Sequence, residues 1–211
     1  MRTDLVAFIA QKTPLPFFMG LIENLEEAYF LAYKDSLDYA EPEQKRILPQ
    51  MRHYRQNTAL RKTALSVGLS SSAPHTNPKG ERYSVAFAED ITFGRTSVPF
   101  HNRIPRPSKH RAAIASVNTR LEPINLDLFT PVTKPTGDAL GCLVITVNPP
   151  HHEGQSVPRN ICIGVPYSNL KGWHLFEPVT EVLAAYNPAN EIQVPDLAFA
   201  KLKIKLRDAE Q

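Results

Sequence analysis

The stretch GCLVITVNPPHHEGQSVPRNICIGVPYSNLKGWHLFEPVTEVLAAY, residues 141–186, decides the fold. Two apolar, β-branched runs, 141–148 and 161–168, flank a loop with Pro, Gly and Asn, a pattern that predicts two buried strands. The run at 174–186 predicts a helix that covers one face of the resulting sheet. The apolar stripe of this helix comprises Leu175, Val179, Val182, Leu183 and Tyr186.

Two helices are predicted in the N-terminal third of the chain. Apolar residues recur at helical spacing through residues 15–40, and Pro14 and Pro16 stand at the start of this run, where proline is tolerated. Residues 43–66 predict a second helix, which starts or kinks at Pro49. Both runs have the apolar face that a helix needs to pack on a sheet.

The middle of the chain predicts a linker, a pair of strands and another helix. Three consecutive serines and two prolines make residues 67–80 a linker by composition. Residues 83–90 and 91–100 alternate apolar and polar side chains, as paired strands do. Ser108 is a favourable N-cap for a helix over residues 108–120.

A short strand at 124–129 and a second strand at 197–208 complete the expected sheet, and the lysines of the second are typical of a protected edge strand. The whole pattern predicts an α+β fold, in which an N-terminal helical pair and two further helices pack on a mostly antiparallel sheet. The expected organisation is a helical region at 1–66, the linker, and an α+β domain at 81–211. The alternative is one continuous domain that includes 1–66.

Composition narrows the class of protein. The 19 prolines against 9 glycines argue against an all-helical chain, and 42% hydrophobic residues are enough for a core. Cys142 and Cys162 fall inside strand candidates, so we expect buried thiols in a reducing compartment. The N-terminus lacks the pattern of a signal peptide, and acidic residues interrupt the next apolar run. These features predict a cytoplasmic protein with no membrane partner.

The charge of the chain is unevenly distributed. Residues 1–43 contain 3 basic and 8 acidic residues, residues 44–121 contain 14 and 3, and residues 122–211 contain 7 and 10. A basic central third of this kind favours a polyanionic partner, with nucleic acid first. The alternative is that the acidic N-terminal helix neutralises the basic one.

Two groups of cations are the candidate contacts for the phosphate backbone. The first lies beside the apolar seam of the 43–66 helix and comprises Lys45, Arg52, Arg55 and Lys62. The second lies within residues 91–121, a segment with no acidic residue, and comprises Arg103, Arg106, Lys109 and Arg111. For the first group, the alternative is a solvated face or pairing with acidic residues of the preceding helix.

The first turn of the predicted 108–120 helix has an unfavourable arrangement of charges. Lys109, His110 and Arg111 would lie beside the positive end of the helix, where cations are unfavourable. A bound phosphate or carboxylate would remove the conflict, because the free backbone N–H groups also attract anions. The alternatives are a different helix start, or neutralisation by acidic groups of another element.

An enzyme is the second hypothesis. The chain has no P-loop, dinucleotide-binding, HExxH, CxxC or GxSxG motif, so the common nucleotide-hydrolysing, redox, zinc and esterase sites are disfavoured. The candidate residues for a His-based phosphoester hydrolase or nuclease are His101, His151, His152 and His174. No metal or other cofactor is predicted. The third hypothesis is a protein-interaction module, with a homodimer formed through the N-terminal helices.

Overall fold

A computed structural model of the protein describes residues 2–122 and 139–186. Helices α1 (Arg2–Lys12), α2 (Leu15–Ser36) and α3 (Glu41–Ser66) come first. Strands β1 (Ser70–Ser72), β2 (Val85–Ala88) and β3 (Ile91–Pro99) follow, and then helix α4 (Lys109–Ser116) and the 3₁₀ helix η1 (Val117–Leu121). The described chain ends with β4 (Leu140–Asn148), β5 (Asn160–Pro166), β6 (Trp173–Pro178) and α5 (Val179–Ala184).

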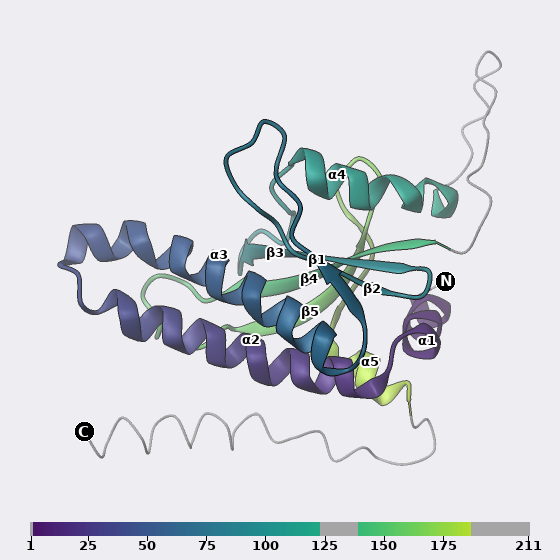
Figure 1. Cartoon of the computed structure of the whole chain (residues 1–211), viewed down its shortest axis with the longest axis horizontal. Helices are drawn as coiled ribbons and strands as arrows, with labels where there is room; N and C mark the ends of the chain where they lie inside the picture. The colour runs from purple at the N-terminus through teal and green to yellow at the C-terminus, as the bar shows by residue number, and fades with distance from the viewer. Residues whose placement is uncertain (1, 123–138, 187–211) are drawn as a thin grey trace.

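The six strands form one sheet in the order β1-β2-β3-β4-β5-β6. Every neighbouring pair is antiparallel except β3 and β4, which run parallel and are connected through α4. A parallel pair needs a crossover of this kind, because a tight hairpin reverses the chain. Helices α2 and α3 lie side by side on one face, and α4 lies on the other (Figure 1). The predicted α+β fold, with its helical pair and mostly antiparallel sheet, is confirmed.

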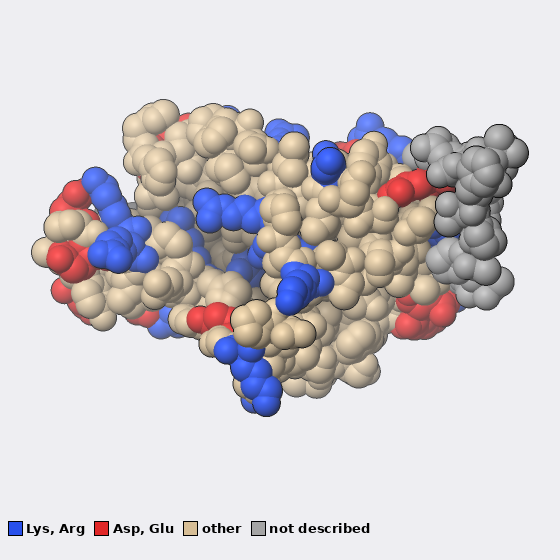
Figure 2. Space-filling view, turned by 90° about the horizontal axis from the view of Figure 1, so that it is seen from above, with Lys and Arg blue, Asp and Glu red and all other residues tan. Residues whose placement is uncertain are grey.

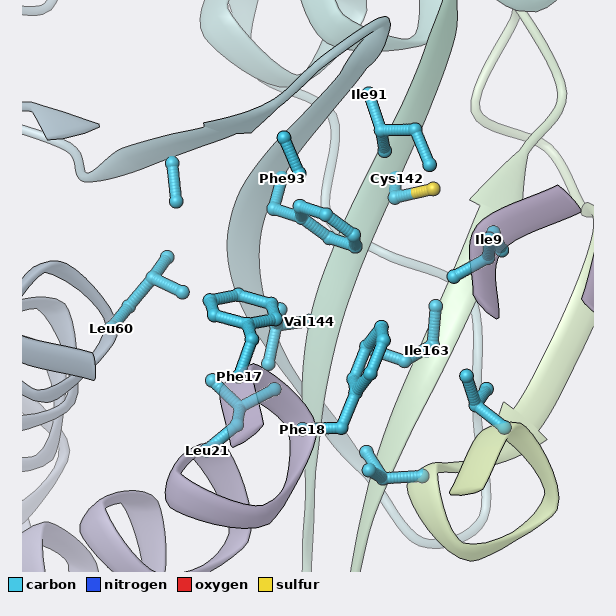
Figure 3. Packing of buried hydrophobic residues seen from close by; sticks show 14 of the residues in the cluster. Ile9, Phe17, Phe18, Leu21, Leu60, Ile91, Phe93, Cys142, Val144 and Ile163 are labelled. Atoms are coloured by element: carbon cyan, nitrogen blue, oxygen red, sulfur yellow. The ribbon is translucent and has the colours of Figure 1, made fainter. Parts of the chain in front are cut away.

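The larger core lies between the sheet and the helices α1, α2, α3 and α5. The rings of Phe17 and Phe18 from α2 contact Phe93 of β3, with ring centroids 5.2 and 6.0 Å apart (Figure 3). All three rings are fully buried. Because aromatic pairs add about 0.5–1.5 kcal/mol beyond the burial of their surface, they anchor the helical pair to the sheet.

The smaller core lies beneath α4 on the opposite face. Ile114 of α4 packs between two strands, and two glycines allow this approach. A Cβ at Gly94 would lie 2.4 Å from Ile114 Cδ1, and a Cβ at Gly141 would lie 1.9 Å from the Ile114 carbonyl oxygen. Asn118 of η1 fixes the contact, since its side chain accepts a hydrogen bond from Gly141 N and donates to Gly141 O, both at 2.9 Å.

One predicted element is wrong. Residues 174–178 form part of β6 and pair with β5, whereas the apolar stripe predicted a helix over 174–186. The helix begins only after Pro178, which has no N–H for the ladder and is tolerated at a helix start. Leu175 nevertheless shares the larger core with Val179 and Val182, because strand and helix both direct these side chains inward.

Other details also differ from the sequence pattern. Residues 2–12, for which no element was predicted, form α1, and α3 continues through Pro49. Ser70–Ser72, inside the predicted linker, pair with β2. The predicted strands at 124–129 and 197–208 lie outside the described residues.

Both cysteines are buried and free, as expected. In the described part of the chain no single helix has the length and hydropathy to span a membrane. The two criteria are met by α1 and α2 only when they are joined across their 95° bend.

Candidate anion-binding site

The second half of β3 extends past the end of β2. The β2–β3 pairing includes only residues 91–93 of β3, so Arg95 and Ser97 lie beyond it. The side chain of Arg95 points to the face that α3 covers, because it alternates with Phe93 of the larger core. A charged side chain is thereby placed between a strand and a helix.

Arg95 is only 8% exposed and is held entirely by neutral groups. Its Nε donates to Asn57 Oδ1 at 3.1 Å, and its Nη1 donates to Gln56 Oε1 and to Ser97 Oγ. Its Nη2 lies 3.3 Å from His53 Nδ1. Within the described residues no carboxylate forms an ion pair with Arg95. A buried cation without a counter-charge is costly, so this arrangement calls for an anion.

The groups around Arg95 have more hydrogen-bond donors than acceptors. Gln56 Oε1 accepts from both Arg95 and Thr146, which leaves the buried Gln56 Nε2 without a partner. Asn57 Oδ1 accepts from Arg95, so its Nδ2 must face His53 Nε2, at 3.0 Å. His53 then meets a donor at each ring nitrogen, although a neutral imidazole has only one acceptor. The network therefore lacks acceptors, which an oxyanion would provide.

Helix α4 contributes two further side chains. The predicted N-cap is present, since Ser108 Oγ accepts from Arg111 N at 3.4 Å. The ring of His110 stacks on Tyr83, with centroids 4.3 Å apart. Arg111 Nη1 donates to the Arg106 carbonyl oxygen at 2.7 Å, while its buried Nε has no partner. Arg111 thus adds a second cation and another unused donor.

The pKa shifts of these side chains show that they interact electrostatically. Burial, reinforced by the charge of Arg111, lowers the pKa of Arg95 to about 9, so the guanidinium stays charged at neutral pH. Burial and then the charge of Arg95 lower the pKa of His53, with a smaller lowering by Arg111, while Glu81 and a hydrogen bond to the Arg82 backbone oppose them. Burial, Arg111 and His53 lower the pKa of His110 to about 4. We call the set the donor-rich cluster: His53, Gln56, Asn57, Arg95, His110 and Arg111.

The lowered pKa of His110 predicts a loss of stability in mild acid. The unfolded chain binds a proton at this imidazole near pH 6.5 and the folded chain near pH 4, so stability falls as the pH drops through this window. We expect His110 to account for about 3 kcal/mol of this loss. Replacement His110→Phe keeps a ring on Tyr83 but has no proton to bind. Urea unfolding at several pH values should therefore show a weaker pH dependence in H110F than in H151F, a control in an exposed loop. Equal slopes would contradict the assignment.

The space-filling view from above α4 shows a hollow with Lys and Arg side chains around it (Figure 2). Of the predicted contacts on α3, however, three have partners within the protein. Arg52 is buried, with its guanidinium 3.8 Å from the centroid of the Tyr29 ring. Arg55 forms an ion pair with Asp35, and Lys45 pairs with Glu41 at 2.9 Å.

The remaining cations of the prediction are distributed over three places. Lys62 lines a groove between α2 and α3. Arg106 and Arg111 come together, and Lys109 is exposed in the first turn of α4. Arg103 lies over the ring of Phe176 on the opposite side of β4 and β5 from α2, in a separate pocket.

The four histidines of the enzyme hypothesis lie on three separate segments. His101 follows β3 and contacts Phe100, and His151 and His152 are exposed between β4 and β5. His174 of β6 lies 3.9 Å from Glu122. Among the described residues, no group of three or more His, Cys, Asp and Glu side chains is placed to hold a metal ion.

Four members of the donor-rich cluster belong neither to the predicted contacts nor to the predicted anion-binding turn at 109–111: His53, Gln56, Asn57 and Arg95. A sequence signal exists for three of them, because His53, Gln56 and Asn57 are spaced to share one helix face. Polar residues on the inward face of a helix indicate a buried polar site. Arg95, in contrast, follows the ordinary alternation of a strand.

The cluster combines two arginines, two imidazoles that are neutral at pH 7, and amide donors, at the end of β3 that extends past β2. This chemistry suits a phosphate or another oxyanion, whose oxygens accept several hydrogen bonds at once. Comparison with known proteins adds no assignment: no family model, curated protein or solved structure matches this chain.

Proposed function

We propose that the protein binds a phosphate-rich ligand, nucleic acid in the first place, and that the donor-rich cluster holds one phosphate of its backbone. The observation that carries this proposal is the buried guanidinium of Arg95, whose four partners are all neutral. A phosphate oxygen near Arg95 and Arg111 would supply both the missing charge and the missing acceptor. Charge-assisted bonds of this type are about twice as strong as neutral ones.

The charge of the chain favours a polymer over a small anion. Residues 44–121 contain 14 basic and 3 acidic residues, and exposed cations such as Arg106 and Lys109 lie next to the cluster. Such cations contact successive phosphates and release counterions, which makes binding strongly dependent on salt. They carry no sequence information, so we expect weak discrimination between sequences.

Replacement of Arg111 by glutamine tests the proposal directly. Binding of a fluorescently labelled oligonucleotide should weaken about tenfold in R111Q, because the phosphate loses one guanidinium contact. The slope of log affinity against log salt should also decrease by about one. Fluorescence anisotropy at several salt concentrations measures both quantities.

The matched control is Lys45→Gln, which removes the same charge from the exposed, far end of α3. We expect less than about a twofold change for K45Q, because its ammonium group already pairs with Glu41. Equal losses in R111Q and K45Q would show that general charge, and not the cluster, attracts the ligand. Absence of binding even at low salt would refute the proposed function.

A phosphoester hydrolase is a second candidate function, because the two imidazoles of the donor-rich cluster are neutral at pH 7. A general base must be deprotonated at the working pH, and His53 and His110 both have lowered pKa values beside arginines. In this second candidate function, His53 and His110 take the catalytic role predicted from the sequence for four other histidines. Cleavage of labelled RNA or DNA that is lost in His53→Gln but retained in His151→Gln would support it.

A homodimer through the N-terminal helices stays a prediction. The apolar faces of α1, α2 and α3 contribute to the larger core with the sheet. A dimer would therefore use the outer faces of these helices, where Tyr54 and Leu65 are exposed. Sedimentation analysis of the full chain measures its oligomeric state.

A further inference from the structure

A pocket of about 420 Å³, separate from the donor-rich cluster, lies on the same face of the sheet as α4. The residues that follow β3 form one of its walls. Its floor is made by β4, β5 and β6, through Val147, Cys162 and Phe176. Its rim is made by two arginines and an exposed ring, Arg103, Arg159 and Phe100. The volume is sufficient for one nucleobase with part of its sugar.

A glycine near the pocket makes room for Trp173, which holds one of the lining segments in place. A Cβ at Gly164 would lie 2.5 Å from the ring of Trp173, so the absent side chain lets the indole pack closely against β5. The indole Nε1 donates to the Arg103 carbonyl oxygen at 2.8 Å. This hydrogen bond fixes the segment after β3 over the sheet and positions the Arg103 side chain at the pocket.

Each arginine of the pocket lies over an aromatic ring. The guanidinium carbon of Arg103 is 5.3 Å from the centroid of Phe176, and that of Arg159 is 5.5 Å from the centroid of Phe100. Both distances are those of cation–π contacts, which hold a guanidinium plane near an aromatic face. The pocket therefore presents flat, stacked surfaces together with positive charge.

The acidic groups at the pocket have cationic partners. Glu177 pairs with Arg2 at 2.6 Å, and Glu153 lies 3.7 Å from Arg159. Within the described residues Arg103 has no carboxylate partner in ion-pair contact. The positive charge of Arg103 is thus free to face a ligand, and the stacked rings suit a flat one.

We propose that this pocket holds an unpaired nucleobase, and hence that the ligand is a single-stranded polynucleotide. The inference rests on the proposed function, because the donor-rich cluster supplies the phosphate contact. Stacking of bases on aromatic rings and arginines, beside cations that follow the backbone, is how proteins bind single strands with little sequence preference. A base-paired duplex cannot insert a base between Phe100, Phe176 and the two arginines.

The wild-type protein provides the first measurement. A single-stranded oligonucleotide of about 12 nucleotides should bind about tenfold more tightly than an abasic strand of equal length or a duplex. Strands of DNA and RNA are both measured, because the stacking chemistry is common to them. Trp173, the only tryptophan of the chain, lies 5.3 Å from Phe176, so its fluorescence should change with the single strand alone.

Replacement Phe100→Leu provides the second measurement, since it removes the ring but keeps an apolar side chain. We expect about tenfold weaker binding of the single strand by F100L and no change with the abasic strand. The control is Phe87→Leu on β2, because Phe87 and Phe100 are both 38% exposed. F87L should bind like the wild type.

The outcomes separate the two proposals. Equal affinity for the single strand, the abasic strand and the duplex would overturn the nucleobase pocket and leave the phosphate-binding function standing. Equal behaviour of F100L and F87L would also overturn it. Absence of binding to every strand would refute the proposed function and this inference together.

Discussion

Replacement of Arg95 by methionine is expected to abolish most oligonucleotide binding without destabilising the fold. The cluster holds a buried guanidinium among neutral groups, and exchange of a buried charge for an apolar side chain of similar length is often neutral or stabilising. A charge-assisted contact to phosphate, in contrast, is worth about 1.5–3 kcal/mol, so the dissociation constant should increase roughly ten- to a hundredfold. Anisotropy with a labelled oligonucleotide and urea unfolding measure the two effects.

The matched control for R95M is Arg52→Met. Arg52 and Arg95 are both 8% exposed, and both point toward the interior from neighbouring elements. Arg52, however, donates to the Gln155 carbonyl oxygen and lies over the Tyr29 ring, so it stabilises the β4–β5 loop. We expect R52M to lose stability and keep its binding. If R95M instead loses stability and binds normally, Arg95 has a structural role and the proposed site is wrong.

The fold could be predicted where one element buries one face over several turns. The 15–40 pattern found α2 because most of its buried apolar residues belong to the same larger core. The prediction failed at 174–178, where Leu175 has helical spacing to Val179 only because a strand and a short helix meet at Pro178. Hydrogen bonding to β5 decided between the two structures, and this partner is not part of the local pattern.

The candidate site could be predicted as a region but not as a set of side chains. Excess charge placed it in residues 44–121, yet Arg52 and Arg55 of that region bond within the protein. Arg95 and Asn57 are separated by 38 residues and meet only because β3 extends past β2 beside α3. Whether an arginine faces solvent, a carboxylate or neutral amides is decided by such long-range contacts, which a pattern of charges does not contain.

Substitution of Gly141 by alanine is expected to have the largest effect on stability, because it lies where α4 meets the sheet. The new Cβ would lie 1.9 Å from the carbonyl oxygen of Ile114, a backbone atom that no rotamer change can move away. Either α4 moves off β4, or the hydrogen bonds between Asn118 and Gly141 break. We expect the free energy of unfolding to decrease by about 3 kcal/mol or more.

Urea unfolding of G141A measures this loss, with two glycine variants for comparison. Gly154→Ala should be close to neutral, because no atom lies within 4 Å of the added Cβ. Gly94→Ala should have an intermediate effect, because its nearest neighbour is the flexible end of Ile114. A midpoint for G141A equal to that of G154A would contradict the packing of α4 described above. Helix α4 also positions His110 and Arg111 of the donor-rich cluster. The fraction of G141A that remains folded should therefore bind oligonucleotide less tightly than G94A. This result would link the packing of α4 on Gly141 to the donor-rich cluster.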